Sequence, residues 1–158
     1  MSKSGAGHWP CGERGPTLRV VLDTCVLKLA TLPARVNPSA MIVELVLSRR
    51  LEAWASPAMI EEYTEVLREQ AEILQRVVQR LEVCYPLTEL EVIHHKPDNR
   101  FLECALAVEA HYLITVNTAR GHFDRKAYQD VRVATPGEFL QEPRVAVLVK
   151  AWLTSQGR

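Results

Sequence analysis

Short runs of branched apolar residues alternate along the chain with longer segments whose apolar residues recur at helical spacing. The first run, residues 18–22, predicts a buried strand that ends at a single carboxylate, Asp23, where a helix-compatible segment begins. Open α/β sheets bind their ligands outside the carboxyl ends of the strands. Asp23 therefore either caps the following helix or belongs to a site at this edge of a sheet.

The same two patterns continue to the end of the chain. Further strands are predicted at residues 51–55, 112–116 and 131–134, and helices at residues 39–48, 57–70, 71–83, 99–110, 136–140 and 145–152. Asn37 and Ser56 are N-cap residues followed by proline, and Thr135 opens a capping box. Residues 87–95 fit either a short strand or a turn of helix. This alternation predicts an α/β fold with a central, mainly parallel sheet flanked by helices on both faces.

Composition narrows the class of protein. The chain has 158 residues, of which 47% are hydrophobic and 24% charged, as in globular domains. We expect a flexible tail at residues 1–17, one domain at residues 18–141, and a C-terminal amphipathic helix at residues 142–158 that packs on its own domain or on a partner. Because no apolar run has membrane-spanning length and no signal peptide is visible, we expect a cytoplasmic protein without membrane contact.

Charge and cysteine content exclude two further classes. Lys and Arg together number 19, as do Asp and Glu, so the chain lacks the basic excess of a passive nucleic-acid coat. A local basic rim remains compatible with this total if an acidic centre cancels it. The four cysteines form no close pair in the sequence, which is typical of reduced, structural thiols rather than of a disulfide framework or a zinc site.

The predicted helix at residues 57–70 places one glutamate beside the core. Its apolar stripe centres on Tyr63. At about 100° per residue, Glu61 and Glu65 lie nearly opposite this stripe, whereas Glu62 lies at its flank. Only Glu62 is therefore placed to reach along the edge of the core into a cleft, and a solvated surface position is its alternative.

Two more polar residues lie at the ends of predicted elements. Asp98 lies at the first turn of the helix at residues 99–110, near the middle of the apolar stripe, so its carboxylate must be capped, paired or coordinated. Capping of its own helix is the simplest of these roles. Asn117 follows directly on the strand at residues 112–116, just as Asp23 follows the first strand.

These four residues, Asp23, Glu62, Asp98 and Asn117, come from separate elements that this topology can bring to one edge of the sheet. Carboxylates that converge without cationic partners repel one another, and a divalent cation relieves that repulsion. Hard oxygen ligands favour Mg²⁺ or Mn²⁺, which can bind a phosphodiester oxygen and lower the pKa of an attacking water.

Histidine and basic residues offer weaker signals. His94 and His95 are not expected to bind metal, because adjacent side chains point in different directions and no partner has helical or zinc-finger spacing. We expect them to be loop or RNA-facing histidines. The densest basic cluster, in residues 118–128, consists of Arg120, His122, Arg125 and Lys126. It is either a solvated loop or a positive rim for a phosphate backbone.

Five segments follow one another along the chain in an order that is typical of a known family. They are VVLDTCVL at 20–27, SPAMIEEY with EVL at 56–67, PDNRFLECAL at 97–106, AHYLITVN at 110–117 and TPGEFL at 135–140. In this order and spacing they resemble the PIN-domain nucleases, and within them the VapC-like toxins of toxin–antitoxin systems. The resemblance implies a single PIN-like domain that acts as a metal-dependent endoribonuclease on RNA, commonly a homodimer inhibited by a small antitoxin protein.

The resemblance also assigns roles by position. The acidic metal ligands or water activators would be Asp23, Glu62 and Asp98, bound to Mg²⁺ or Mn²⁺. On the hypothesis of an endoribonuclease, we further expect Asn117 to be an outer ligand that completes the catalytic set, and the phosphate contacts to be Arg100, Arg120 and Arg125.

Two positions depart from the family's pattern. Cys25 stands where the family usually has Asn, which is expected to loosen the hydrogen bonding around Asp23. Asn117 stands where many members have a further Asp, so the site holds a metal with less charge and lower affinity. Both departures leave open a second hypothesis, a catalytically decayed PIN fold that serves as an RNA-binding or protein-interaction module.

Overall fold

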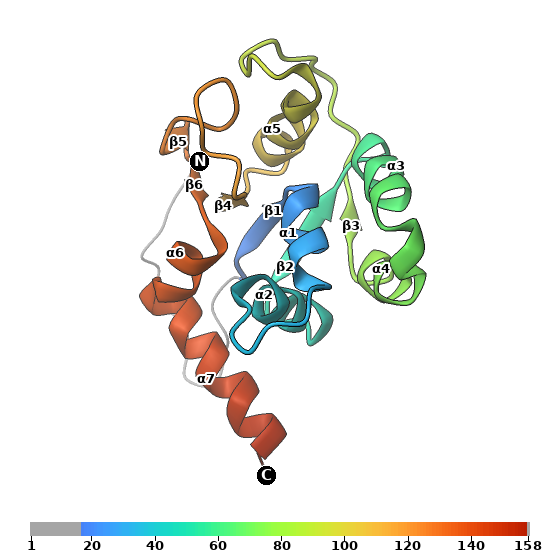
Figure 1. Ribbon diagram of the computed structural model, residues 1–158. Coiled ribbons are helices and arrows are strands. Elements are labelled where there is room, and N and C mark those ends of the chain that lie inside the picture. Colours follow the sequence, from blue (N-terminus) through green and yellow to red (C-terminus); the bar gives the residue numbers. More distant parts are fainter. Residues whose placement is uncertain (1–16, 158) are drawn as a thin grey trace.

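A computed structural model describes residues 17–157 (Figure 1). Nearly all of the tail predicted at residues 1–17 therefore lies outside the described residues. The strands are β1 (Arg19–Leu22), β2 (Glu52–Ala55), β3 (Glu82–Val83), β4 (Tyr112–Ile114), β5 (Ala127–Tyr128) and β6 (Val131–Ala134). The helices are α1 (Thr24–Ala30), α2 (Pro38–Leu47), α3 (Pro57–Val66), α4 (Ala71–Val78), α5 (Asn99–Ala107), α6 (Pro136–Gln141) and α7 (Pro143–Gly157), with 3₁₀ helices η1 (Arg68–Gln70) and η2 (Lys96–Asp98).

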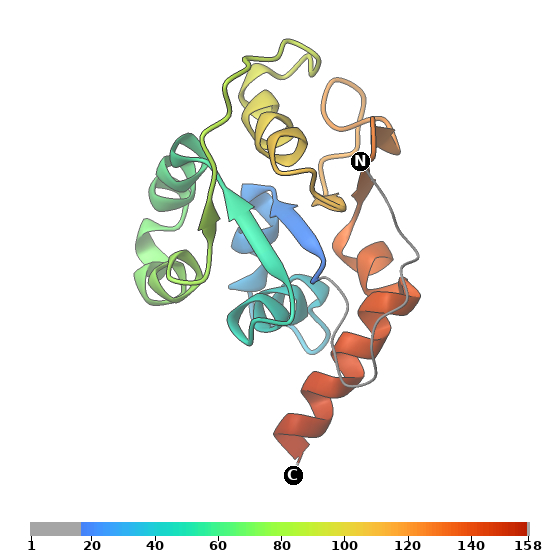
Figure 2. The same cartoon turned by 180° about the vertical axis from the view of Figure 1, so that it is seen from behind.

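The strands form one sheet in the order β3-β2-β1-β4-β6-β5, and all neighbours are parallel except β5 and β6. Figure 2 shows the arrows of β1 and β2 side by side and pointing the same way. The chain passes from β1 to β2 to β3 in one direction and then crosses to β4 on the other side of β1. Because parallel crossovers are right-handed, the helices before β3 cover one face and α5 covers the other. The predicted α/β fold is confirmed.

This reversal of direction creates a switch point between β1 and β4, where the following loops leave toward different parts of the molecule. Helix α5 packs against β1, β2 and β4, while α2 packs with α1, α4, α6 and α7. In open α/β sheets the crevice outside the carboxyl ends of strands at such a point is the usual ligand site. A ligand site is therefore expected among the residues that follow β1 and β4.

The N-caps predicted from the sequence are present. Asn37 Oδ1 accepts a hydrogen bond from the Ala40 amide at 3.1 Å, and Ser56 Oγ accepts one from the Met59 amide at 3.3 Å. At α6, the Thr135 amide donates to Glu138 Oε1 at 2.9 Å, which closes the capping box. These local contacts explain why the starts of the helices follow the sequence closely.

Three segments differ from their predictions. The helix predicted at residues 71–83 ends at Val78, and Glu82 and Val83 instead pair with β2 as the edge strand β3. Residues 87–95, predicted as a strand or a turn of helix, form neither. The polar segment at 118–128 ends in a strand, β5, which the sequence pattern did not indicate. β3 forms because it pairs with the distant strand β2, whereas β5 forms because it pairs with the neighbouring strand β6 in a hairpin.

The core is built on four large aromatic residues, Tyr63, Phe101, Phe123 and Phe139. The Tyr63 hydroxyl donates to the carbonyl of Leu22 and so ties α3 to the last residue of β1. The thiols of Cys84 and Cys104 lie 2.8 Å apart within this core as free cysteines, a proximity that their sequence separation did not reveal.

The C-terminal helix α7 packs on its own domain through Val145, which is fully buried, against α2 and α6. Leu148 and Trp152 are partly buried on the same side, whereas Val147 is 67% exposed. None of the helices among the described residues combines the length and the hydropathy that crossing a membrane requires.

Candidate metal centre

Asp23 lies at the switch point, directly after β1. Its backbone amide donates to the carbonyl of Ile114 at 3.0 Å, so the ends of β1 and β4 are joined. The side chain is only 3% exposed. The donors that converge on its Oδ2 atom are Thr115 Oγ1 at 2.7 Å, Asn117 Nδ2 at 3.3 Å and Cys25 Sγ at 3.4 Å. The side chain of Asp23 does not cap α1. Of the two predicted roles, helix cap or member of a site, the second therefore fits the structure.

The charge on Asp23 is poorly compensated. Burial raises the pKa of its carboxyl, and the nearby charge of Asp98 raises it further, against the opposing effect of the hydrogen bonds from Thr115 and Cys25. Among residues 17–157, no Lys, Arg or His forms an ion pair with it. A divalent cation in contact with this carboxylate would supply the missing positive charge.

Cys25 and Asn117, the two departures from the family's pattern, both contact Asp23. Burial and the charge of Asp23 raise the pKa of the Cys25 thiol to about 12, so this group remains a neutral donor. The Asn117 amide nitrogen, rather than its oxygen, faces the carboxylate, and its backbone amide donates to Thr115 Oγ1 at 2.9 Å. Both residues thus orient Asp23.

Glu62 lies on α3 at the flank of the core. It is partly buried, while Glu61 and Glu65 are exposed, as the helical spacing predicted. Its Oε2 atom accepts a hydrogen bond from the hydroxyl of Thr24, and its Oε1 atom lies 3.4 Å from Arg100 Nη1. Glu62 is therefore linked to the residue after Asp23 and to the residue two positions after Asp98.

Asp98 lies at the start of α5 and is 5% exposed. Its side chain does not cap the helix, which was the simplest role predicted for it. Instead, Oδ1 lies 3.2 Å from His95 Nδ1 and Oδ2 lies 2.8 Å from His122 Nδ1. One ligand atom from each of these three residues lies within 4.8 Å of the others, which is close enough to hold a metal ion.

The two histidines were missed by the sequence analysis. His95 and Asp98 are three residues apart on one turn and His122 approaches from the loop after β4, so His95 does have possible ligand partners nearby. That His95 binds no metal stays a prediction. The His95 amide donates to the carbonyl of Gly121 at 2.8 Å, which joins the two loops. The spacing of His95 and Asp98 was a visible signal, but nothing local identified His122 as their partner.

The four predicted site residues thus surround one edge of the sheet but are unequally close. Asp23 and Asn117 are hydrogen-bonded, and Asp98 lies near enough to influence the charge on Asp23. Glu62 reaches them through Thr24 and Arg100 rather than directly. In the described range 17–157, the tight group able to hold a metal is His95, Asp98 and His122 rather than the three carboxylates.

Basic side chains line two hollows beside this edge. Arg120 and Arg125 are exposed and line a cavity of about 480 Å³ together with His122. The Arg125 guanidinium lies 5.5 Å above the ring of Tyr128. The third predicted phosphate contact, Arg100, is the partner of Glu62.

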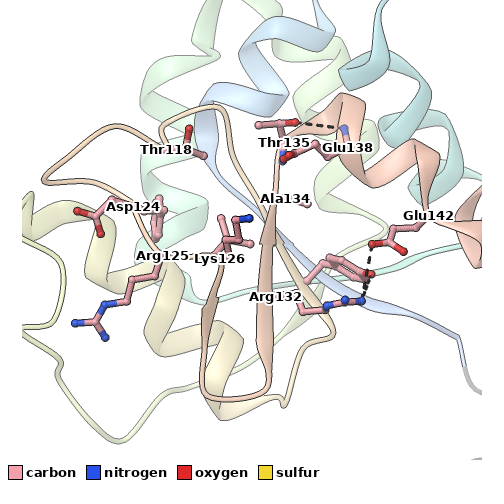
Figure 3. A pocket seen from close by; sticks show the side chains of 12 residues that line it. Thr118, Asp124, Arg125, Lys126, Arg132, Ala134, Thr135, Glu138 and Glu142 are labelled. Atoms are coloured by element: carbon pink, nitrogen blue, oxygen red, sulfur yellow. Dashed lines mark hydrogen bonds and ion pairs between the residues drawn. The ribbon is translucent and has the colours of Figure 1, made fainter.

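The second hollow, about 460 Å³ in volume, lies over β6 and is drawn in Figure 3. Thr118, Arg125 and Lys126 lie on one side of it. On the other side Arg132 pairs with Glu142 at 3.8 Å. Arg125 lines both hollows, and the second hollow is mixed in charge because its lining also contains Asp124, Glu138 and Glu142.

One family model matches most of the chain. Residues 19–119 match the family model described as PIN domain. The matched segment begins with β1 and contains all four predicted site residues, and it ends before β5 and the C-terminal helices. No curated protein gives a significant match.

Proposed function

Because the chain belongs to the PIN-domain family, whose members are generally metal-dependent nucleases, we propose that it is an endoribonuclease that hydrolyses RNA phosphodiester bonds with Mg²⁺ or Mn²⁺. The observation that carries the proposal is the buried carboxylate of Asp23, which has no cationic partner among the described residues and lies beside Asp98 where β1 and β4 end. A charge of this kind needs a cation, and oxygen ligands favour these two ions.

The residues present fit a divalent cation. Asp23 and Asp98 would be its principal ligands, and Glu62 would be a further ligand or the general base. When bound, the ion supplies positive charge to a phosphodiester oxygen and lowers the pKa of the attacking water. Asn117 would act as an outer ligand that holds the Asp23 carboxylate in position.

Neighbouring donors hold the acids in place before any substrate arrives. Three donors converge on one oxygen of Asp23 and fix the direction of its carboxylate. Thr24 and Arg100 hold Glu62 between the loops that carry the two aspartates. Groups fixed in this way lose little further freedom when they engage the reacting phosphate.

RNA would lie across the exposed basic residues beside this edge. Arg120 and Arg125 are the proposed backbone contacts, and Arg100 would reach a phosphate next to Glu62. Each phosphate contact that is removed should lower the salt dependence of single-stranded RNA binding by about 0.7 in logarithmic slope. Measuring this slope for an Arg125→Ala variant tests the contact separately from the chemistry.

The resemblance of the five segments to VapC-like toxins supports a role as the toxin of a toxin–antitoxin pair, acting in the cytoplasm. The protein would form a homodimer and bind a small antitoxin protein. Expression of the wild type should arrest bacterial growth, and expression of an Asp23→Asn variant should not. Equal growth of the two strains at equal protein levels would contradict the toxin role.

Cys25 and Asn117 favour a second candidate, a PIN fold that binds RNA without cleaving it. Both stand where ligand-supporting or acidic residues are expected, and both now donate to Asp23. Such a module would bind RNA through the same arginines and would gain no stability from divalent metal. Metal titration followed by thermal unfolding distinguishes it from the nuclease.

The first test is cleavage of a mixed RNA pool by the full chain with Mg²⁺, with Mn²⁺ and with chelator. The nuclease proposal expects metal-dependent cleavage that disappears in an Asp23→Asn, Asp98→Asn double variant. A matched pair, Glu62→Gln and Glu61→Gln, separates the site from the surface of the same helix. Unchanged cleavage by the double variant would exclude these acids as the metal ligands.

A further inference from the structure

Asp98 has a different set of neighbours from Asp23. Both of its oxygens face imidazole nitrogens, His95 Nδ1 at 3.2 Å and His122 Nδ1 at 2.8 Å. The carboxylate is buried, whereas the side chains of His95 and His122 are 51% and 34% exposed. The cluster is therefore closed toward the core and accessible from solvent on the histidine side.

The separations in this cluster suit neighbouring ligands of one metal ion. With bonds of about 2.1 Å, two ligands at right angles around an ion lie about 3.0 Å apart. The two separations, 2.8 Å from His122 Nδ1 to Oδ2 of Asp98 and 3.2 Å from His95 Nδ1 to Oδ1, fall on either side of this value. The rings of His95 and His122 have centroids 4.8 Å apart and are tilted by 39°, and one ligand atom from each of His95, Asp98 and His122 lies within 4.8 Å of the others.

The loops that carry the histidines are fixed independently of any ligand. The His95 amide donates to the Gly121 carbonyl at 2.8 Å, and the His122 amide donates to the Ala119 carbonyl at 3.0 Å. Figures 1 and 2 both show the loop before α5 beside the loop after β4. On the other side of Asp98, Asn99 accepts from the amides of Val92 and Ile93 and so holds the approach to α5.

We propose that His95, Asp98 and His122 form a mixed nitrogen and oxygen site for a late first-row divalent cation, Co²⁺, Ni²⁺ or Zn²⁺. The proposal rests on the proposed function in that Asp98 is shared with the nuclease centre. Imidazole suits these cations, whereas Mg²⁺ prefers oxygen ligands and keeps its waters. The histidines therefore favour a borderline cation at this cluster, whereas the carboxylate oxygens of Asp23 and Asp98 favour Mg²⁺ or Mn²⁺.

The alternative is that the imidazoles only donate hydrogen bonds to the buried carboxylate. In that case His95 and His122 compensate the charge of Asp98, and Co²⁺ has no greater affinity than Mg²⁺. The two possibilities give opposite results on adding metal, because a metal ion needs the same Nδ1 atoms that would otherwise carry protons.

The test measures binding of Co²⁺ and Mg²⁺ to the purified full chain. Titration should give a dissociation constant at least about tenfold lower for Co²⁺ than for Mg²⁺, as expected from the order of affinities at nitrogen-containing sites. His95→Gln and His122→Gln should each weaken Co²⁺ binding by about 100-fold or more, since even the loss of an outer-shell partner costs roughly 10–100-fold. His94→Gln, at an exposed histidine outside the cluster, is the matched control and should leave Co²⁺ binding unchanged.

A second measurement needs no variant. In proton NMR spectra of the Co²⁺-loaded wild type, two strongly shifted, exchangeable imidazole resonances should appear, one for each bound histidine. Equal Co²⁺ affinity in the wild type and the two His→Gln variants would overturn the proposal.

The outcome is separable from that of the nuclease proposal. An Asp23→Asn variant should keep Co²⁺ binding, because Asp23 is not in the cluster, while its RNA cleavage disappears. Cleavage with Mg²⁺ but no preference for Co²⁺ would overturn the histidine site alone. A Co²⁺ site in a protein that cleaves no RNA with any metal would overturn the nuclease proposal alone.

Discussion

Polar groups lie at both ends of the β1–β4 pair, but those at the amino end are paired with one another, whereas the carboxylate at the carboxyl end has no cationic partner among the described residues. At the amino end, the Arg19 amide donates to His111 Nδ1 at 2.9 Å and the His111 amide donates to the Arg19 carbonyl at 2.9 Å. The Arg19 guanidinium donates to the carbonyls of Val108 and Glu109 at 3.0 and 2.9 Å. At the carboxyl end, the donors to Asp23 among residues 17–157 are all neutral, and they orient its carboxylate without neutralising it.

The pKa shifts show the same contrast. Burial and the charge of Arg19 lower the pKa of His111, so this imidazole is neutral and serves as an acceptor. Burial and the charge of Asp98 raise the pKa of Asp23, so folding opposes the charge that a metal ligand must carry. The amino end is thus a structural clamp, and the carboxyl end holds a carboxylate that no Lys, Arg or His among residues 17–157 pairs with.

The largest expected effect is on chemistry at the carboxyl end. Asp23→Asn should reduce RNA cleavage about a thousandfold or more, since a catalytic metal contributes several kcal/mol and about 1.4 kcal/mol is a factor of ten. Single-turnover cleavage at saturating metal measures this loss. Cleavage within tenfold of the wild type would remove Asp23 from the proposed site.

The same substitution should have the opposite effect on stability. Without metal, Asp23→Asn removes a buried charge and should raise the thermal midpoint, by roughly 2–4 °C for each kcal/mol in a chain of this size. Saturating Mg²⁺ should raise the midpoint of the wild type and leave that of the variant unchanged. Differential scanning calorimetry with Mg²⁺ and with chelator gives both values, and a variant less stable than the wild type in chelator would contradict this account.

A smaller effect is expected at the amino end. Arg19→Gln removes the guanidinium bonds to two carbonyls and should lower the free energy of unfolding by about 1–3 kcal/mol. Its rate of RNA cleavage should stay within about twofold of the wild type, because the clamp lies at the opposite end of the strand. Urea denaturation and the cleavage assay test the two parts, and a large loss of activity in a folded variant would break the contrast between the ends.

What the sequence predicted well is local. Asp23 follows a strand of adjacent branched residues, and the caps at Asn37 and Ser56 depend on contacts within three residues. For the same reason the helical spacing separated Glu62 from its exposed neighbours on α3.

What the sequence did not predict depends on distant partners. The two-residue strand β3 exists because Glu82 and Val83 pair with β2, and helices α3 and α4 lie between these two strands in the sequence. The His122 contact with Asp98 spans 24 residues and arises only when the loops before α5 and after β4 meet. Such contacts between loops follow from the order of strands in the sheet, and this order cannot be read from a short window of sequence.

The smallest expected effect is the pH dependence of the amino-end clamp. The folded state binds a proton at His111 less readily than the unfolded chain does, because burial lowers the pKa of this imidazole from its ordinary 6.5. The stability that neutral His111 contributes is therefore complete above pH 6.5 and is lost as the pH falls through that value toward the lower pKa of the folded state. Asparagine can accept the same bond from the Arg19 amide and does not titrate. In urea denaturation between pH 5 and 8, about the range in which His titrates, His111→Asn should lose less stability on acidification than the wild type does. Since both proteins share every other titrating group, parallel curves would show that the clamp does not depend on the charge of His111.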